Sequence, residues 1–121
     1  MRKRQHKILY WLGDSLESLK QFSEAAKREA GHQLSSVQEG FEPDDWKPMT
    51  TVGVGVKEVR IKLEKAYRVM YVAKFPEGVY VLHAFDKKTQ RTSKTDLDLA
   101  TTRYKRLVKE RKSIHDQTHH E

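Results

Sequence analysis

The chain has 121 residues, a net charge of +7 and no cysteine. Its length suffices for one domain with a single core, and the absence of cysteine excludes a disulfide framework and a thiolate metal site. No apolar run approaches the roughly 18 residues of a membrane-spanning helix, and the basic residues after Met1 precede no apolar stretch of a signal peptide. We therefore expect a very polar globular protein that has no membrane partner and resides in the cytoplasm.

The first forty residues predict a strand followed by helical structure. Residues 8–12 form an apolar run that is typical of a short buried strand. Asp14 offers an N-cap oxygen, and Glu17 follows three residues later, as at many helix starts. Apolar residues then recur at spacings of three and four, which predicts one amphipathic helix, or two helices broken near Gly31, ending at Gly40.

The rest of the chain predicts a loop, three strands, a second loop and a helix. Residues 41–56 are rich in Pro, Gly and Asp and are predicted to form a connector. Short turns suitable for antiparallel hairpins separate the predicted strands, which are 57–63, 67–75 and 79–85. A polar loop over 87–95 precedes the final helix, whose apolar stripe includes Tyr104.

This element order favours an α+β fold with a small, antiparallel-rich sheet of about four strands. An N-terminal helix or helical hairpin and a C-terminal helix are expected to pack on one face and to leave the other face free. Residues 1–112 are predicted to form the single domain, and residues 113–121 a flexible tail.

Positive charge is concentrated in the middle third of the chain. Residues 54–94 contain ten Lys and Arg residues against four Asp and Glu, whereas the flanking segments are nearly balanced. An evenly spread surplus would suit a solubilising surface equally well. Its concentration in one segment favours a polyanionic partner, with nucleic acid preferred over a membrane surface.

Alternation along the predicted strands gathers basic side chains on one face of the sheet. Arg60 and Lys62 point away from Val59 and Ile61, and Arg68 lies across a short hairpin from both cations. Three neighbouring cations repel one another and do not stabilise the fold. The pattern therefore fits a phosphate-binding surface, but it fits an ordinary solvated face equally well.

The segments after these two strands carry further candidates. The polar loop at the sheet edge can close over a nucleic-acid strand or be a plain solvated turn, and its candidates are Lys87, Lys88, Gln90, Arg91 and Lys94. His83 alternates with Val81 and Phe85, which favours a hydrogen-bonded core histidine; the alternative is a proton-transfer group near the basic surface.

No metal or cofactor site is expected. His115, His119 and His120 lie in a polar tail without a carboxylate framework. The chain also shows no Ser–His–Asp triad, paired carboxylates or glycine-rich nucleotide loop. If the protein is an enzyme, its cations, histidine and hydroxyls suit metal-independent RNA cleavage, in which a 2′-hydroxyl attacks the neighbouring phosphate.

Four segments resemble the RelE/ParE toxin superfamily, and in particular its HigB-like branch, which is often phage-derived. They are Lys57-Glu-Val-Arg-Ile, Tyr67-Arg-Val-Met-Tyr, Val81-Leu-His-Ala-Phe-Asp-Lys-Lys-Thr-Gln and Thr95-Asp-Leu-Asp-Leu-Ala. The resemblance covers roughly residues 7–112 and implies a RelE-like fold and a toxin of a type II toxin–antitoxin pair. In the RelE and HigB branches the toxin enters the ribosomal A site and cleaves the bound mRNA.

The resemblance also implies roles for residues and partners. The basic strand residues that bind phosphate and stabilise the transition state match Arg60, Lys62 and Arg68, and the basic residue after the last strand matches Lys87 or Lys88. His83 and Lys74 are weaker candidates. The resulting catalytic candidates are Arg60, Arg68, Lys88 and His83. The RNA-binding candidates, taken from the resemblance and from the basic pattern of the chain, are Lys57, Lys62, Lys74, Lys87, Gln90, Arg91 and Lys94. The tyrosine that serves as a base in RelE has no counterpart in residues 87–100, so no base is assigned.

The implied partners are a helix-turn-helix antitoxin, the ribosome with its mRNA, and operator DNA through the antitoxin alone. There are two alternatives to a ribosome-dependent endoribonuclease. One is a ParE-like toxin that acts on gyrase, in which the basic face binds protein. The other is a non-catalytic, RNA-binding protein of phage origin.

Overall fold

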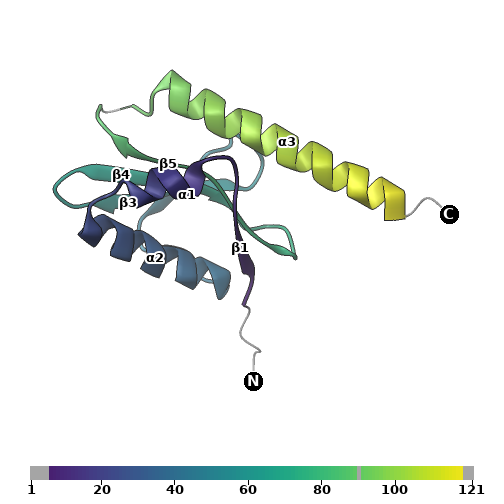
Figure 1. Cartoon of the computed structure of the whole chain (residues 1–121), viewed down its shortest axis with the longest axis horizontal. Coiled ribbons are helices and arrows are strands. Elements are labelled where there is room, and N and C mark those ends of the chain that lie inside the picture. The colour runs from purple at the N-terminus through teal and green to yellow at the C-terminus, as the bar shows by residue number, and fades with distance from the viewer. Residues whose placement is uncertain (1–5, 90, 119–121) are drawn as a thin grey trace.

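The computed structural model describes residues 6–89 and 91–118 (Figure 1). Its elements are β1 (Ile8–Trp11), α1 (Ser15–Lys20), α2 (Glu24–Gln38), β2 (Trp46–Pro48), β3 (Val56–Lys62), β4 (Ala66–Val72), β5 (Gly78–Lys87) and α3 (Lys94–Thr118). The predicted α+β architecture, with helices at both ends of the chain, is confirmed. Within the described ranges, no helix is both long and apolar enough to cross a membrane.

The five strands form one sheet in the order β1-β5-β4-β3-β2. The strands from β5 to β2 are antiparallel to their neighbours, whereas β1 runs parallel to β5. The edge strand β2 falls in the segment predicted as a loop, so the sheet has one strand more than expected. Pro48 is tolerated there because a proline on an edge strand costs no hydrogen bond to an inner neighbour.

Helix α2 covers one face of the sheet through residues spaced three and four apart. Ala26, Ala30 and Leu34 pack against β-strand residues that include Val59 and Ile61, so the alternation predicted for β3 is confirmed. The helical segment is interrupted before α2 and not near Gly31, which lies inside the helix. The cause is Ser23, whose side chain accepts a hydrogen bond from the Ala26 backbone N–H and caps α2.

Helix α3 covers the opposite face, so the prediction that all helices share one face is wrong. Figure 1 shows the sheet between α2 and α3. Ala100 and Leu107 of α3 are buried in a second core together with Met70, Val72 and Leu82 of the sheet. Met70, Val72 and Leu82 are large apolar side chains, and their exposure on an uncovered face would be unfavourable. Helix α3 buries them.

Helix α3 is also longer than the sequence indicated. Residues 113–118, predicted as part of a flexible tail, continue the helix, and residues 119–121 lie outside the described part of the chain. The helix projects past the edge of the sheet towards its C-terminal end (Figure 1). Besides its apolar core contacts, α3 is anchored by an ion pair between Arg111 and Glu77, with 2.6 Å between Arg111 Nε and Glu77 Oε2.

Two glycine substitutions test the packing of α3. A Cβ atom at Gly53 would lie 2.4 Å from the Tyr104 ring, whereas one at Gly31 would meet open space. Gly53→Ala is therefore expected to destabilise the protein by about 1–3 kcal/mol. Gly31→Ala, in a helix interior, should stabilise it by about 0.5–1 kcal/mol. Denaturant unfolding measures both values, and an unchanged stability of Gly53→Ala would contradict the described position of α3.

The anchoring pair predicts a dependence of stability on pH. The hydrogen bond from Arg111 lowers the pKa of Glu77 to about 2, below the roughly 4.3 of an unfolded chain. The pair therefore stabilises the fold above the unfolded pKa and is lost as the pH falls towards 2. Unfolding measured at pH 7 and pH 2.5 should show that Glu77→Gln destabilises the protein clearly more at pH 7 than at pH 2.5. An equal effect at both values would argue against the pair.

Candidate nucleic-acid interface

Four basic side chains lie together on the α3 face of the sheet, each from a different strand. Lys47 of β2, Arg60 of β3, Arg68 of β4 and Lys87 of β5 are called the cationic cluster below. Arg60 lies directly opposite Arg68 in the strand register. Burial lowers the pKa of Lys87, and the positive charges of Arg68, Lys47 and Arg60 lower it further. The four cations are therefore close enough to repel one another.

A buried carboxylate, Glu58, lies among these cations. Its side chain is 0% exposed and that of Arg68 is 4% exposed. The Glu58 Oε1 atom is 3.4 Å from Arg68 Nε and 4.0 Å from Lys47 Nζ. Arg68 Nη1 also donates a hydrogen bond of 3.0 Å to the Tyr67 carbonyl. Asp45 is a second carboxylate whose charge acts on Arg68. With four cations and two anions, the site keeps a surplus of positive charge.

Several polar atoms of the site lack a hydrogen-bond partner. Within the described residues, the Nε atoms of Arg60 and Arg68 and the Oε1 atom of Glu58 are buried without one. Unsatisfied buried polar groups are few in native proteins and commonly have a functional reason. Guanidinium groups donate hydrogen bonds only, and their planar fork matches a phosphate. The arrangement therefore suits an anionic ligand.

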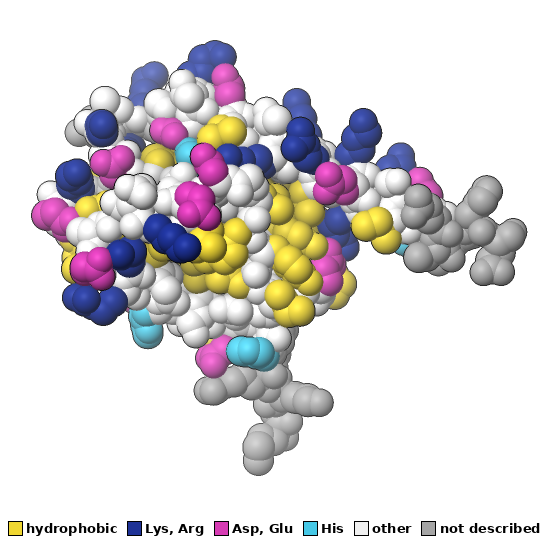
Figure 2. Space-filling model, in the orientation of Figure 1, with side chains coloured by type: hydrophobic (Ala, Val, Ile, Leu, Met, Phe, Trp, Pro, Cys, Tyr) yellow, Lys and Arg dark blue, Asp and Glu magenta, His cyan; other side chains and the backbone are white. Residues whose placement is uncertain are grey.

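The loop between β5 and α3 extends the basic surface. One hollow of about 310 Å³ is lined by Lys87, Lys88 and Arg91, among others. A second, of about 380 Å³, is lined by residues that include Lys47 and Arg91. Figure 2 shows separate Lys and Arg side chains at the upper left of the molecule, with Asp and Glu side chains between them. Because Arg91 lines both hollows, the loop extends the basic surface beside the cluster.

The structure brings five of the predicted residues into or next to the cationic cluster. Arg60, Arg68 and Lys87 come together, and Lys88 and Arg91 lie in the adjoining loop.

Two further candidates lie at the edges of this region. Lys62 is exposed at the end of β3, and Lys94 is exposed at the start of α3, 2.9 Å from Asp98 Oδ2. Gln90 lies outside the described residues. All three stay predictions.

Two candidates lie away from the cluster. Lys57 alternates with Val59 onto the α2 face, where its Nζ is 2.7 Å from Glu42 Oε1 and 4.6 Å from the centre of the Trp46 ring. Lys74 follows β4 at the opposite end of that strand from Arg68 and donates a hydrogen bond of 3.2 Å to the Tyr104 hydroxyl. Neither contributes to the cationic cluster.

Sequence reasoning missed Lys47 and Glu58. Lys47 lies in a three-residue strand whose neighbours, Trp46 and Pro48, gave no strand pattern. Glu58 could have been found, because it shares the α3 face with Arg60 by simple alternation along β3. Its complete burial, however, depends on β2, β4 and the loop before α3, which only the tertiary structure shows.

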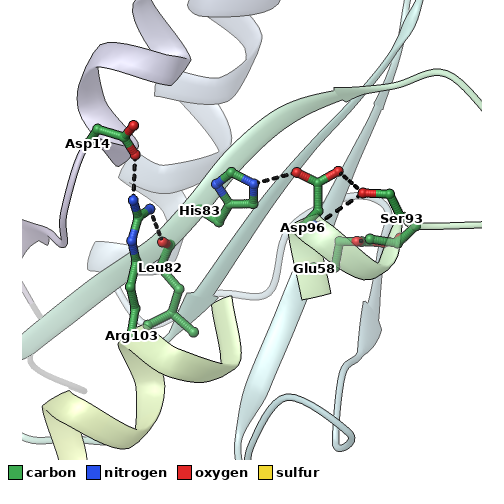
Figure 3. A network of polar contacts seen from close by, with 8 residues as sticks. Asp14, Glu58, Leu82, His83, Ser93, Asp96 and Arg103 are labelled. Atoms are coloured by element: carbon green, nitrogen blue, oxygen red, sulfur yellow. Dashed lines mark hydrogen bonds and ion pairs between the residues drawn. The ribbon is translucent and has the colours of Figure 1, made fainter. Parts of the chain in front are cut away.

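His83 is buried and joins β5 to the start of α3. Its Nε2 atom lies 2.7 Å from Asp96 Oδ1, and Ser93 Oγ donates a hydrogen bond of 2.7 Å to Asp96 Oδ2 (Figure 3). Its ring stacks on Phe85 with 5.0 Å between the ring centres. This geometry favours the hydrogen-bonded core histidine over the proton-transfer group, and the catalytic role stays a prediction.

The predicted regular alternation of Val81, His83 and Phe85 on one face of β5 is wrong, because a β-bulge interrupts it. Met70 pairs with His83 but the next residue, Tyr71, pairs with Val81, so Leu82 is the extra residue of a β-bulge. Val81 therefore packs in the α2 core, whereas Leu82 and Phe85 pack in the α3 core.

No group of three or more His, Asp or Glu side chains in the described part of the chain is arranged to hold a metal ion. His115 is exposed on α3, and His119 and His120 lie outside the described residues.

The comparisons with known proteins give one result. The family model for phage-derived Gp49-like proteins (DUF891) matches residues 17–105, a range that holds the whole cationic cluster. Searches of the curated proteins and of the solved structures give no significant match. Because the matched range covers well over half of the chain, this protein belongs to the phage-derived Gp49-like family, a family of the RelE/ParE-like toxin type.

Proposed function

We propose that the protein is the toxin of a type II toxin–antitoxin system and cleaves mRNA on the ribosome as a HigB-like endoribonuclease. The observation that carries this proposal is the cationic cluster, in which four strands hold four cations around one fully buried carboxylate, Glu58. A solvated surface has no need to bury an arginine among other cations. The toxin type of the family supports the same conclusion.

The proposed reaction is an attack of an RNA 2′-hydroxyl oxygen on the adjacent phosphorus. The bond between phosphorus and the 5′-oxygen breaks as the new bond to the 2′-oxygen forms. The 2′-hydroxyl loses a proton and the leaving 5′-oxygen gains one, so that a 2′,3′-cyclic phosphate and a new 5′-hydroxyl end result with no co-reactant. Negative charge grows on the phosphate oxygens in the transition state, and cations fixed on strands stabilise this charge without reorganising. Arg60 and Lys87, which are only half-buried, are proposed to contact the scissile phosphate. Lys88 and Arg91 would bind flanking phosphates.

The fold supports two further parts of the proposal. The surplus charge of the cluster and its loop favours association with the RNA-rich surface of a ribosome. The toxin type of the family implies an antitoxin partner. We propose a helix-turn-helix antitoxin that inhibits the toxin by denying RNA access to the cluster.

Matched double variants test the function. Expression of the wild-type protein without an antitoxin is expected to arrest growth and to produce new mRNA 5′ ends. Arg60→Ala with Lys87→Ala should lower the cleavage rate on programmed ribosomes by about 10²-fold or more. Lys57→Ala with Lys74→Ala removes the same charge away from the cluster and should leave cleavage within a few-fold of wild type.

Thermal unfolding of each variant serves as the control for folding. Equal effects of the two double variants would contradict the proposed site. A folded wild-type protein that binds RNA without cutting it would identify a non-catalytic binder, and growth arrest without new 5′ ends would indicate another target.

A further inference from the structure

We propose that Glu58 is a positioning residue: it orients Arg68 and Lys47 within the cationic cluster, so that their charges support Arg60 and Lys87 at the scissile phosphate, without touching the RNA itself. This inference rests on the proposed function. Its basis is the location of one wholly buried carboxylate among cations that would otherwise repel one another.

Glu58 contacts three separate parts of the fold. Its Oε1 atom faces Arg68 of β4 and Lys47 of β2, and its Oε2 atom lies 3.5 Å from the hydroxyl of Thr92 in the loop before α3. In the view of Figure 3, Glu58 lies at the loop before α3, in agreement with its contact with Thr92. Through these contacts the Glu58 carboxylate connects the inner strands β3 and β4 with the edge strand β2 and with the loop that carries Lys88 and Arg91.

The cations have few other means of orientation. Arg68 has one hydrogen bond from Nη1, to the Tyr67 carbonyl, and its Nε has no hydrogen-bond partner in the described residues. Burial without a counter-ion is unfavourable for a guanidinium, and its neighbours Arg60 and Lys87 are also positive. Loss of the Glu58 charge is therefore expected to turn Arg68 away from its position.

The same burial excludes a direct role in proton transfer. A general base must come within hydrogen-bond reach of the hydroxyl that it deprotonates. Glu58 is 0% exposed and its oxygens face Arg68, Lys47 and Thr92. It therefore acts through its neighbours and is not a catalytic residue.

The positioning role predicts that removal of the Glu58 charge affects RNA binding and RNA cleavage in opposite directions. Glu58→Gln keeps the shape of the side chain and raises the net charge of the cluster by one. RNA should bind at least as tightly as to wild type, since phosphate binding follows charge. Cleavage should fall by roughly 10²-fold, since misplacement of a group by about 1 Å has an effect of this size.

The test compares Glu58→Gln, Glu58→Asp and Glu24→Gln. Dissociation constants are measured with an RNA oligonucleotide that carries a 2′-deoxy position at the cut, and single-turnover rates are measured on programmed ribosomes. Glu24→Gln changes the net charge equally but lies exposed at the start of α2, so its rate should stay within a few-fold of wild type. Glu58→Asp keeps the charge but is shorter, so it should bind like wild type and cleave more slowly.

Several results would overturn the inference. One is a wild-type rate for Glu58→Gln or Glu58→Asp. Another is a parallel loss of binding and rate in a folded variant. If Glu58→Gln does not fold, Glu58→Asp decides by the same criteria.

A measurement that does not depend on RNA cleavage, NMR of the Arg68 side chain, separates this inference from the proposed function. The ¹⁵N-detected signal of the Arg68 Nε–H group should be sharp and slow to exchange in the wild-type protein and lost or shifted in the Glu58 variants. An unchanged signal would refute the positioning role even if no RNA were cleaved. A failure of the wild-type protein to cleave, with this signal behaving as expected, would refute only the proposed function.

Discussion

The burial of β4 on both faces is the constraint on which the rest of the structure depends. Every residue of this strand from Tyr67 to Val72 is buried, so helices must cover both sides of the sheet. Helix α2 covers one side, and the first half of α3 covers the other. The cations of the α3 face are consequently confined to the end of the sheet where α3 begins. A buried strand thereby sets the position of a charged site.

The cationic cluster exists in spite of its electrostatic cost. Arg68 is almost wholly buried beside Arg60, and burial opposes the charged form of both Arg68 and Lys87. Glu58 and Asp45 offset part of this cost and leave a surplus of positive charge that favours the binding of an external anion. A site of this kind binds anions because the folded protein already holds the cations close together. Such preorganised cations can stabilise the charge that develops in a reaction at a phosphate without rearranging.

Sequence reasoning reached the features that depend on local periodicity. The alternation of Val59 and Ile61 predicted the face that α2 covers, and the short hairpin predicted that Arg60 and Arg68 meet. It failed where long-range packing decides. The strand character of Lys47 comes from its pairing with β3, and the face chosen by α3 depends on the path of the chain. The bulge at Leu82 broke an alternation that the sequence alone could not show to be interrupted.

The central claim, that RNA phosphates bind the cationic cluster, is tested most directly by an experimental structure of the protein with a non-cleavable RNA oligonucleotide. The expected result is a phosphate group within hydrogen-bond distance of Arg60 and Lys87, with the flanking nucleotides along the loop of Lys88 and Arg91. An RNA strand bound instead to the α2 face beside Lys57 would contradict the claim.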